Sequence, residues 1–349
     1  MMCTYMPKSP SNSPQIRGVG KATRKAYSYM VTESQGPHNK VGGGYLEGSK
    51  VSVVIPTFNR PELLSWAIRS VLAQTYQDFE IIVVDDGDKE SAGAVVSSFA
   101  KQNIRYIKNN PPKQGGGATR NRGIEEAEGE YVAFLDDDDE WMPTKLEKQV
   151  FALDSSGVGA SHCGLVVIDN ATKVVREDLP GESGVVDIFD RTLFRCYIWT
   201  SELVVRRALL LKEQFDPTFK KNQEWDLQLR LAKLTKFVAV NEVLVRLNVL
   251  GEDEHMGGSG NVKNIASGFE RLLEKHHVAY AGAPKARARQ RFMLAMFQKK
   301  YGDFENMKRN IAIAFKATPY NKTILIHYLL SRLGKKIYTS TIQLVHIFR

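Results

Sequence analysis

Cysteine is scarce in this sequence, which has three among its 349 residues (Cys3, Cys163 and Cys196) and no pair at CxxC spacing. That number and spacing argue against a disulfide scaffold and a thiolate zinc site, and they fit a reducing compartment. No apolar run reaches the roughly 18 residues that a membrane-spanning helix requires. The N-terminus also lacks the apolar core of a signal peptide, so we expect a cytoplasmic location.

Acidic residues are scarce toward the C-terminus of a chain whose formal net charge is +9. Residues 50–269 hold 26 Lys and Arg against 33 Asp and Glu, whereas residues 270–349 hold 16 against 4. The acidic centre favours an active site built from carboxylates, and we expect no nucleic-acid partner. The basic end predicts contact with an anionic surface, most simply phospholipid headgroups. RNA is the competing interpretation, but the segment has no RRM-like combination of aromatic and basic residues.

The overall composition is ordinary, with 43% apolar and 25% charged residues, as in soluble globular proteins. The length suggests one large domain or two smaller ones. Residues 1–49 are rich in Ser, Pro, Gly and Lys and have no periodic pattern, which predicts a disordered leader. That leader is either a functional tail or sequence upstream of the true start. We therefore expect a leader at 1–49, a catalytic domain at 50–261 and a helical region at 262–349.

Short apolar runs alternate with helical patterns in the first part of the ordered chain. Strands are predicted at 51–55, 79–84, 104–107 and 131–135. This alternation is typical of an α/β fold with a mainly parallel sheet covered by helices. Residues 159–206 are expected to extend the sheet, and 236–248 to form two short strands. The glycine-rich loop at 249–261 is a candidate lid.

Polar residues follow three of the predicted strands. Thr57 and Asn59 follow the first strand, Asp85 and Asp86 end the second, and aspartates 136–139 follow the fourth. In open α/β sheets, ligands bind along the edge formed by the carboxyl ends of the strands. The sequence therefore predicts a binding site at that edge.

The run of four aspartates is the strongest single signal. Neighbouring carboxylates repel one another, and burial would raise their pKa values. A divalent cation relieves both effects, and Mg²⁺ or Mn²⁺ is commonly shared between carboxylates and substrate phosphates. The alternative is a solvated acidic loop, which the strand-end position and the following Trp141-Met142-Pro143 disfavour. Gly115-Gly116-Gly117 fits neither GxGxxG nor a P-loop, so dinucleotide and Walker sites are disfavoured.

Five motifs in order resemble glycosyltransferase family 2, the inverting enzymes of GT-A fold that use nucleotide sugars. They are VVIPTFNR (53–60), IVVDDG (82–87), GGATRNRGI (116–124), GEYVAFLDDDD (129–139) and QEWDL (223–227). The last is similar to the family's acceptor-side motif, where the family usually has Asp at the position of Glu224. The resemblance covers about residues 50–250 and implies a GT-A, Rossmann-like sheet.

The resemblance implies roles for the residues that bind the donor. Asp138 would be the main ligand of Mn²⁺ or Mg²⁺, with Asp136 or Asp137 holding ribose or metal-bound water, and Asp136 a second candidate metal ligand. The remaining candidates line the nucleotide pocket (Pro56, Thr57 and Asn59), contact the uracil or other base (Asp85 or Asp86), or contact the base or diphosphate (Arg120).

The same resemblance implies the residues that act on the acceptor. Glu224 would be the general base that takes the proton from an acceptor hydroxyl. Asp226 is its nearest rival and is expected to orient structure. His255, in the glycine-rich loop, is a further candidate ligand of metal or diphosphate, and the alternative is a solvent-exposed loop histidine.

The basic C-terminal region leaves two interpretations open. An amphipathic basic helix can lie in a membrane interface, which would place the protein at the inner face of the plasma membrane. Alternatively, helical hairpins pack on the catalytic domain and expose a solvated basic face.

The function expected from the resemblance is metal-dependent, inverting transfer of a sugar from a nucleotide donor, expected to be UDP-linked. The acceptor would be a glycan or a lipid-linked sugar, and the setting the assembly of surface polysaccharide. Three alternatives are a transferase acting directly on polyprenyl phosphate, an inactive nucleotide-sugar-binding or membrane-scaffold protein, and a nucleotidyltransferase.

Overall fold

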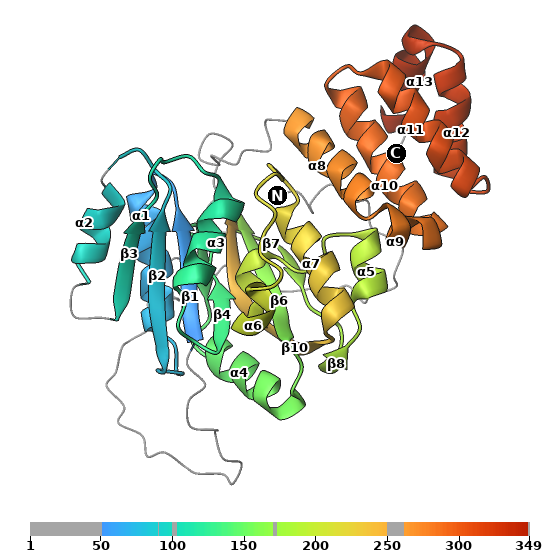
Figure 1. Ribbon diagram of the computed structural model, residues 1–349. Coiled ribbons are helices and arrows are strands. Elements are labelled where there is room, and N and C mark those ends of the chain that lie inside the picture. The colour runs from blue at the N-terminus through green and yellow to red at the C-terminus, as the bar shows by residue number, and fades with distance from the viewer. Residues whose placement is uncertain (1–50, 90, 100–102, 170–172, 250–261, 348–349) are drawn as a thin grey trace.

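The computed structural model describes residues 51–89, 91–99, 103–169, 173–249 and 262–347. Its centre is one twisted sheet in the order β3-β2-β1-β4-β9-β6-β10-β5, with β7 beside β6 and β8 beside β10 (Figure 1). The strands are β1 (Val51–Thr57), β2 (Phe79–Asp85), β3 (Ile104–Lys108), β4 (Tyr131–Phe134), β5 (Asp139–Trp141), β6 (Ala160–Asp169), β7 (Lys173–Asp178), β8 (Gly184–Val186), β9 (Val204–Arg206) and β10 (Phe237–Val249).

The parallel half of the sheet confirms the predicted α/β fold. Strands β3, β2, β1 and β4 run parallel, and β9 joins β4 to β6 in antiparallel pairing. Val53 and Ile55 of β1 pack in a hydrophobic cluster on one face of the sheet, whereas Val54 belongs to the cluster on the other face. Such strands, buried on both sides, read as continuous apolar runs in the sequence.

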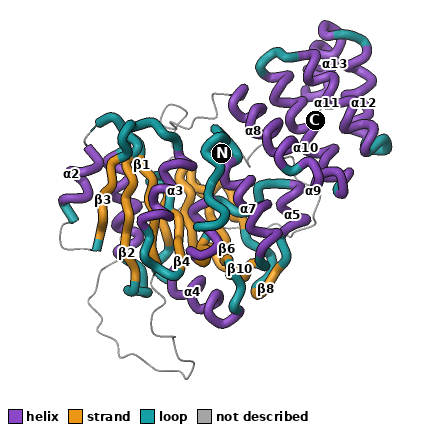
Figure 2. The backbone as a smooth tube through the Cα atoms, in the orientation of Figure 1, coloured by secondary structure: helices purple, strands orange, loops and turns teal. Residues whose placement is uncertain are grey.

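Helices cover both faces, as the purple and orange tubes of Figure 2 show. Side chains of α1, α2 and α4 fill one cluster, and those of α3, α6 and α7 fill the other. The bounds of these elements are α1 (Pro61–Leu72), α2 (Ser91–Ser97), α3 (Gly116–Glu126), α4 (Lys145–Ser156), α5 (Phe189–Phe194), the 3-10 turn η3 (Thr200–Glu202), α6 (Arg207–Leu210) and α7 (Gln223–Leu234).

Strand β10 differs from the sequence prediction. The two short strands expected at 236–248 form one long strand, which pairs with β6, β8 and β5. Its register against β6 shifts between Ala239 and Val243 and again before Val245. Such irregularities break the alternation of buried and exposed residues along the strand. The sequence pattern therefore predicts two short strands where the structure has one. The candidate lid at 249–261 lies almost wholly outside the described residues.

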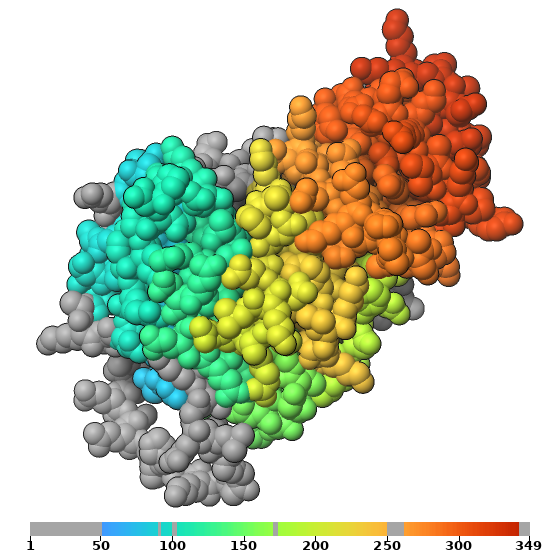
Figure 3. All heavy atoms as spheres, in the orientation of Figure 1, coloured from blue at the N-terminus to red at the C-terminus, as the bar shows by residue number. Residues whose placement is uncertain are grey.

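The chain continues as helices α8 (Val262–Lys275), α9 (His277–Gly282), α10 (Pro284–Lys300), α11 (Phe304–Ala317), α12 (Lys322–Arg332) and α13 (Lys335–Ile347), which we call the C-terminal helices. They project from the sheet-containing body in the space-filling view (Figure 3). Helix α8 anchors them, because Phe269 meets the Trp225 ring of α7 at 5.5 Å within a shared apolar cluster. Across the described residues, no helix is long and apolar enough to cross a membrane.

Candidate active site

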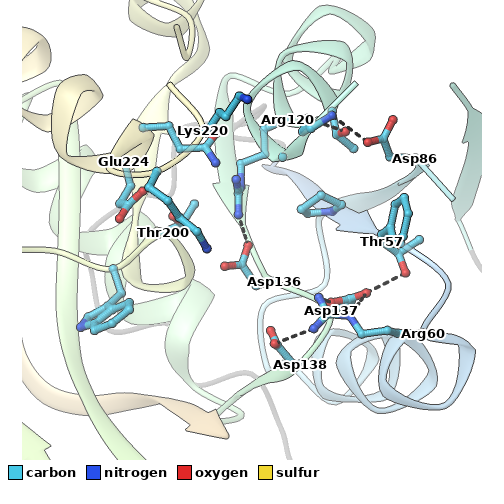
Figure 4. A pocket seen from close by; sticks show the side chains of 18 of the residues that line it. Thr57, Arg60, Asp86, Arg120, Asp136, Asp137, Asp138, Thr200, Lys220 and Glu224 are labelled. Carbon is cyan, nitrogen blue, oxygen red and sulfur yellow. Dashed lines mark hydrogen bonds and ion pairs between the residues drawn. The ribbon is translucent and has the colours of Figure 1, made fainter. Parts of the chain in front are cut away.

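A cavity of about 570 Å³ opens where β1 and β4 end, at the sheet edge that the sequence predicted (Figure 4). Segments that are far apart in the sequence form its walls: the turn after β1, the start of α3, the acidic run after β4, η3, the start of α7, and α8. The lining residues are Pro56, Thr57, Phe58, Arg60, Asp86, Lys113, Gly115, Gly116, Thr119, Arg120, Asp136, Asp137, Asp138, Trp199, Thr200, Lys220, Lys221, Asn222, Gln223, Glu224 and Ile265.

Asp86 shapes the entry to helix α3. Its carboxylate accepts hydrogen bonds from the backbone N–H groups of Gln114 and Gly115, each at 2.8 Å. Gly115 has a φ of +92°, a conformation that glycine adopts without strain. A Cβ at Gly117 would lie 2.5 Å from Oε1 of Gln223, so α3 approaches α7 closely here. The glycine run therefore serves a tight turn and a close contact beside the cavity.

Arg60 clamps two of the four aspartates. Its Nε donates to Oδ2 of Asp137 at 3.2 Å, its Nη2 pairs with Oδ1 of Asp137, and its Nη1 reaches Oδ2 of Asp138 at 2.9 Å. Thr57 Oγ1 donates to Asp137 as well, at 2.7 Å. Burial raises the pKa of Asp137 to about 7, although Arg60 and Thr57 act in the opposite direction. Asp137 therefore holds Arg60 and the turn after β1 in place.

Arg120, on helix α3, forms an ion pair with Asp136, as Arg60 does with Asp137 and Asp138. Its Nη2 forms an ion pair with Oδ1 of Asp136, and its guanidinium lies 5.5 Å from the ring centroid of Phe215. Burial lowers the pKa of Arg120, but the charges of Asp136 and Glu224 outweigh burial and raise it overall. Its Nε is buried without a hydrogen-bond partner among the described residues. The guanidinium as a whole lines the cavity, where it adds a positive charge beside the acidic run.

The last two aspartates of the run have different surroundings. The side chain of Asp138 is 17% exposed and faces the cavity. Asp139 is buried and accepts a 2.5 Å hydrogen bond from Ser201 Oγ, and burial raises its pKa well above the usual range. No three His, Cys, Asp or Glu side chains converge as metal ligands among the described residues. Asp138 and Asp136 nevertheless fit Mg²⁺ or Mn²⁺, which bind through one or two carboxylates plus substrate phosphates.

Glu224 lies across the cavity from the acidic run, in the first turn of α7 (Figure 4). The helix begins directly after Asn222, whose φ of +66° turns the chain into it. Among the described residues none donates a hydrogen bond to the Glu224 carboxylate. Lys220 and Lys221 line the same wall, and burial lowers the pKa of Lys221 while Glu224 opposes that effect. This wall therefore combines a half-buried carboxylate with two cations.

Three other candidate residues, Asn59, Asp85 and Asp226, do not line the cavity. Asn59 donates to Asp88 and accepts from the Lys89 backbone, which braces the turn after β2. Asp85 is buried and accepts hydrogen bonds from Tyr106 and Lys108.

Asp226 is wholly buried on the far side of α7. It pairs with Arg230, Lys275 and His276, and these partners lower its pKa despite burial. This arrangement is consistent with the expected orienting role. His255 lies outside the described residues.

Sequence reasoning missed Arg60 and the two lysines. Arg60 is the last residue of the first motif, but nothing in the motif indicates that its side chain contacts Asp137, 77 residues later in the chain. Lys220 and Lys221 stand in a loop without a motif of their own. Their one signal is their place just before the acceptor-side motif.

Comparison with protein families matches residues 52–208 to the model described as Glycosyl transferase family 2. The amylovoran biosynthesis glycosyltransferase AmsB of Erwinia amylovora is 32% identical over 224 residues, covering 60% of this chain and 73% of AmsB. The Escherichia coli UDP-Glc:alpha-D-GlcNAc-diphosphoundecaprenol beta-1,3-glucosyltransferase WfgD is 29% identical, covering 55% of this chain and 73% of WfgD. An uncharacterized glycosyltransferase of Rickettsia bellii is 27% identical over 215 residues. The match covers 62% of this chain but only 31% of that protein.

Solved structures show the same fold. Staphylococcus aureus TarS 1–349 in complex with UDP-GlcNAc superposes with a TM-score of 0.56 at 18% identity, covering 76% of this chain and 81% of that one. The mannosyltransferase PcManGT of Pyrobaculum calidifontis, in complex with GDP-Man and Mn²⁺, gives a TM-score of 0.53 at 16% identity. The superposition covers 84% of this chain and 83% of PcManGT. Because the family model and the AmsB relationship agree with this fold and with the five motifs, the chain belongs to glycosyltransferase family 2.

Proposed function

We propose that this glycosyltransferase moves a sugar from a UDP-sugar to a lipid-linked acceptor, with metal dependence and with inversion at the anomeric carbon. The observation that carries the proposal is the placement of Glu224 opposite Asp136–Asp138 across one cavity. A base on one side and a diphosphate site on the other are what a single inverting displacement needs. Cell-surface polysaccharide assembly is the proposed setting, as the name of AmsB suggests for that relative.

The donor diphosphate would lie between the acidic run and helix α3. Mn²⁺ or Mg²⁺ held by Asp138 and Asp136 would supply Lewis-acid stabilisation of the charge that develops on the leaving group. Arg120, which lines the cavity, would contribute a fixed positive charge from the opposite side. Arg60 would keep Asp138 oriented through its 2.9 Å contact.

Glu224 would act on the acceptor. Its carboxylate would accept the proton of an acceptor hydroxyl while that oxygen bonds to the anomeric carbon. The bond from the anomeric carbon to the nucleoside diphosphate breaks on the opposite face, which inverts the configuration. One carboxylate is enough for this reaction, and no covalent sugar–enzyme intermediate is required.

The two lysines support an anionic acceptor. Lys220 is exposed at the cavity, and no described residue forms an ion pair with it. Two cations beside the base would attract the diphosphate of a lipid-linked sugar, the acceptor class in the name of WfgD. A neutral glycan acceptor would gain nothing from them.

A screen of nucleotide sugars with Mn²⁺ tests the donor assignment. We expect a UDP-sugar to raise the melting temperature and to be hydrolysed slowly, with a smaller effect from GDP-sugars. Asp138→Asn should weaken the Mn²⁺-dependent part of UDP binding by about tenfold or more, the usual scale for disturbing a metal ligand shell. The matched control is Asp190→Asn, an exposed carboxylate of α5. Equal Mn²⁺ dependence in Asp138→Asn and wild type would remove Asp138 from the metal site.

Acceptor assays separate the remaining alternatives. Transfer to a short sugar diphosphate lipid without free polyprenyl phosphate would exclude direct transfer to polyprenyl phosphate. Release of pyrophosphate from a nucleoside triphosphate would instead indicate a nucleotidyltransferase. Tight donor binding with no turnover under any condition would indicate an inactive binding protein.

A further inference from the structure

Helix α12 and the start of α13 expose four large aliphatic side chains. Ile326 and Leu329 lie on α12, Leu333 directly follows its last residue, and Ile337 lies on α13. We call these four side chains the stripe. Their exposed fractions are 44, 55, 58 and 50%, respectively. Ile326 and Leu329 are three residues apart and therefore lie on one face of α12. The stripe therefore places four exposed aliphatic side chains within residues 326–337.

The opposite face of α12 is already packed. Ile324 and Ser331 are buried, and His327 Nδ1 lies 2.6 Å from the Tyr338 hydroxyl of α13. The helix is thus fixed by its inner face, and among the described residues the stripe belongs to neither apolar cluster of these helices. Large apolar surfaces that a fold leaves open mark sites of contact with another surface.

Positive charge surrounds the stripe. Lys322, Arg332, Lys335 and Lys336 are all exposed, and none pairs with a carboxylate among the described residues. Residues 306–349 contain eight Lys and Arg and no Asp or Glu, and the nearby acidic residues are Asp303 and Glu305, which line a hollow with Lys335. The net positive charge of this region favours an anionic partner.

We propose that α12 and the start of α13 dock on a bilayer surface with anionic phospholipid headgroups. Aliphatic side chains enter the headgroup boundary while the flanking cations meet the lipid phosphates. A second copy of this chain would bring equal positive charge against the stripe. A nucleic acid would satisfy the cations but leave the aliphatic side chains exposed.

The docking surface is connected to the active site. Ile265 of α8 lines the cavity, and its cluster includes Leu294 of α10. Met307 of α11 and Tyr338 of α13 share the next cluster with Ala295 of α10. Docking would therefore hold the cavity at a defined height above the bilayer. This deepens the proposed function, because a lipid-linked acceptor lies at that surface, yet the docking itself needs no substrate.

Vesicle flotation of the full chain without substrates tests the proposal. The probes are vesicles of phosphatidylcholine alone and of phosphatidylcholine with phosphatidylglycerol. We expect flotation only with the anionic vesicles, and less at high salt. Leu329→Glu/Leu333→Glu should abolish it. Lys335→Gln/Lys336→Gln should weaken binding about fivefold per charge, since each cation near such a surface contributes about 1 kcal/mol.

Matched controls come from the sheet-containing body, where Leu211, Leu234, Lys212 and Lys236 are also exposed. Leu211→Glu/Leu234→Glu and Lys212→Gln/Lys236→Gln should float like wild type. Absence of wild-type flotation, or equal flotation of the stripe variants, would overturn the proposal. So would a dimer in light scattering that the stripe variants dissociate, since that result identifies a second copy as the occupant. Because no donor or acceptor is present, these outcomes are independent of the transferase activity.

Discussion

At the scale of residues, the four aspartates show how far a sequence motif predicts a site. The sequence predicted that they follow a strand at a binding site, and three of the four line the cavity there. The sequence could not predict the different partners of the aspartates. Those partners are Arg60, Arg120 and Ser201, which come from distant segments of the chain. Asp136–Asp138 face the cavity, whereas Asp139 is buried against η3.

The Arg60–Asp137 pair makes a prediction about stability. Asp137 has no exposed side-chain surface, so Arg60→Ala would leave a buried carboxyl without its main partner. We expect the free energy of unfolding in urea to fall by about 3 kcal/mol. Arg60→Ala/Asp137→Asn should recover part of that loss because it removes the unpaired acid. An unchanged midpoint in Arg60→Ala would show that the pair does not stabilise the fold.

Lys220 makes a prediction about acceptor charge. Lys220→Ala should raise KM about tenfold for a diphosphate-linked sugar, which corresponds to the roughly 1.4 kcal/mol of a charged contact. KM for the same sugar as a neutral alkyl glycoside should not change. Lys212→Ala is the matched control on an exposed lysine outside the cavity. Equal effects on both acceptors would mean that Lys220 does not recognise their charge.

At the scale of elements, regular patterns were predicted well and irregular ones were not. The four apolar runs between 51 and 135 are strands β1 to β4, as expected from their burial on both faces. Strand β10 was read as two pieces because its register shifts obscure its pattern. The insertion of β9 between β4 and β6 depends on pairing across the sheet, which local sequence does not encode.

His162 of β6 makes a prediction about pH. It is buried against the rings of Tyr197 and Phe237, and burial lowers its pKa from 6.5 to about 4. The unfolded chain therefore binds a proton that the folded chain excludes, so stability falls as pH drops through this window. We expect this histidine to remove roughly 2 kcal/mol between pH 7 and pH 5.

The measurement is urea unfolding of wild type and His162→Phe at both pH values. The variant should lose that part of the pH dependence, whatever its absolute stability. His277→Phe, at an exposed position, should keep the wild-type pH dependence. The same slope in His162→Phe and wild type would contradict a buried neutral imidazole.

At the scale of the whole molecule, the uneven distribution of charge corresponds to two structural parts. The acidic centre forms the sheet-containing body with its cavity, and the basic end forms the C-terminal helices. The sequence left open whether those helices pack or lie in a membrane. The structure shows α8 and α10 packed on α5 and α7, while α12 keeps an apolar face exposed. Composition predicted the basic region, but the exposed stripe required the folded helix.

The transfer rate of Glu224→Gln tests the central claim most directly, because this change removes the proposed base with little change in size. We predict that acceptor-dependent release of UDP slows by at least about 10²-fold, the usual contribution of a general base. Mn²⁺-dependent binding of UDP should stay near that of wild type, and Glu305→Gln, at an exposed site on α11, should transfer normally. A transfer rate of Glu224→Gln close to that of wild type would contradict the assignment of this cavity as the catalytic centre with Glu224 as its base.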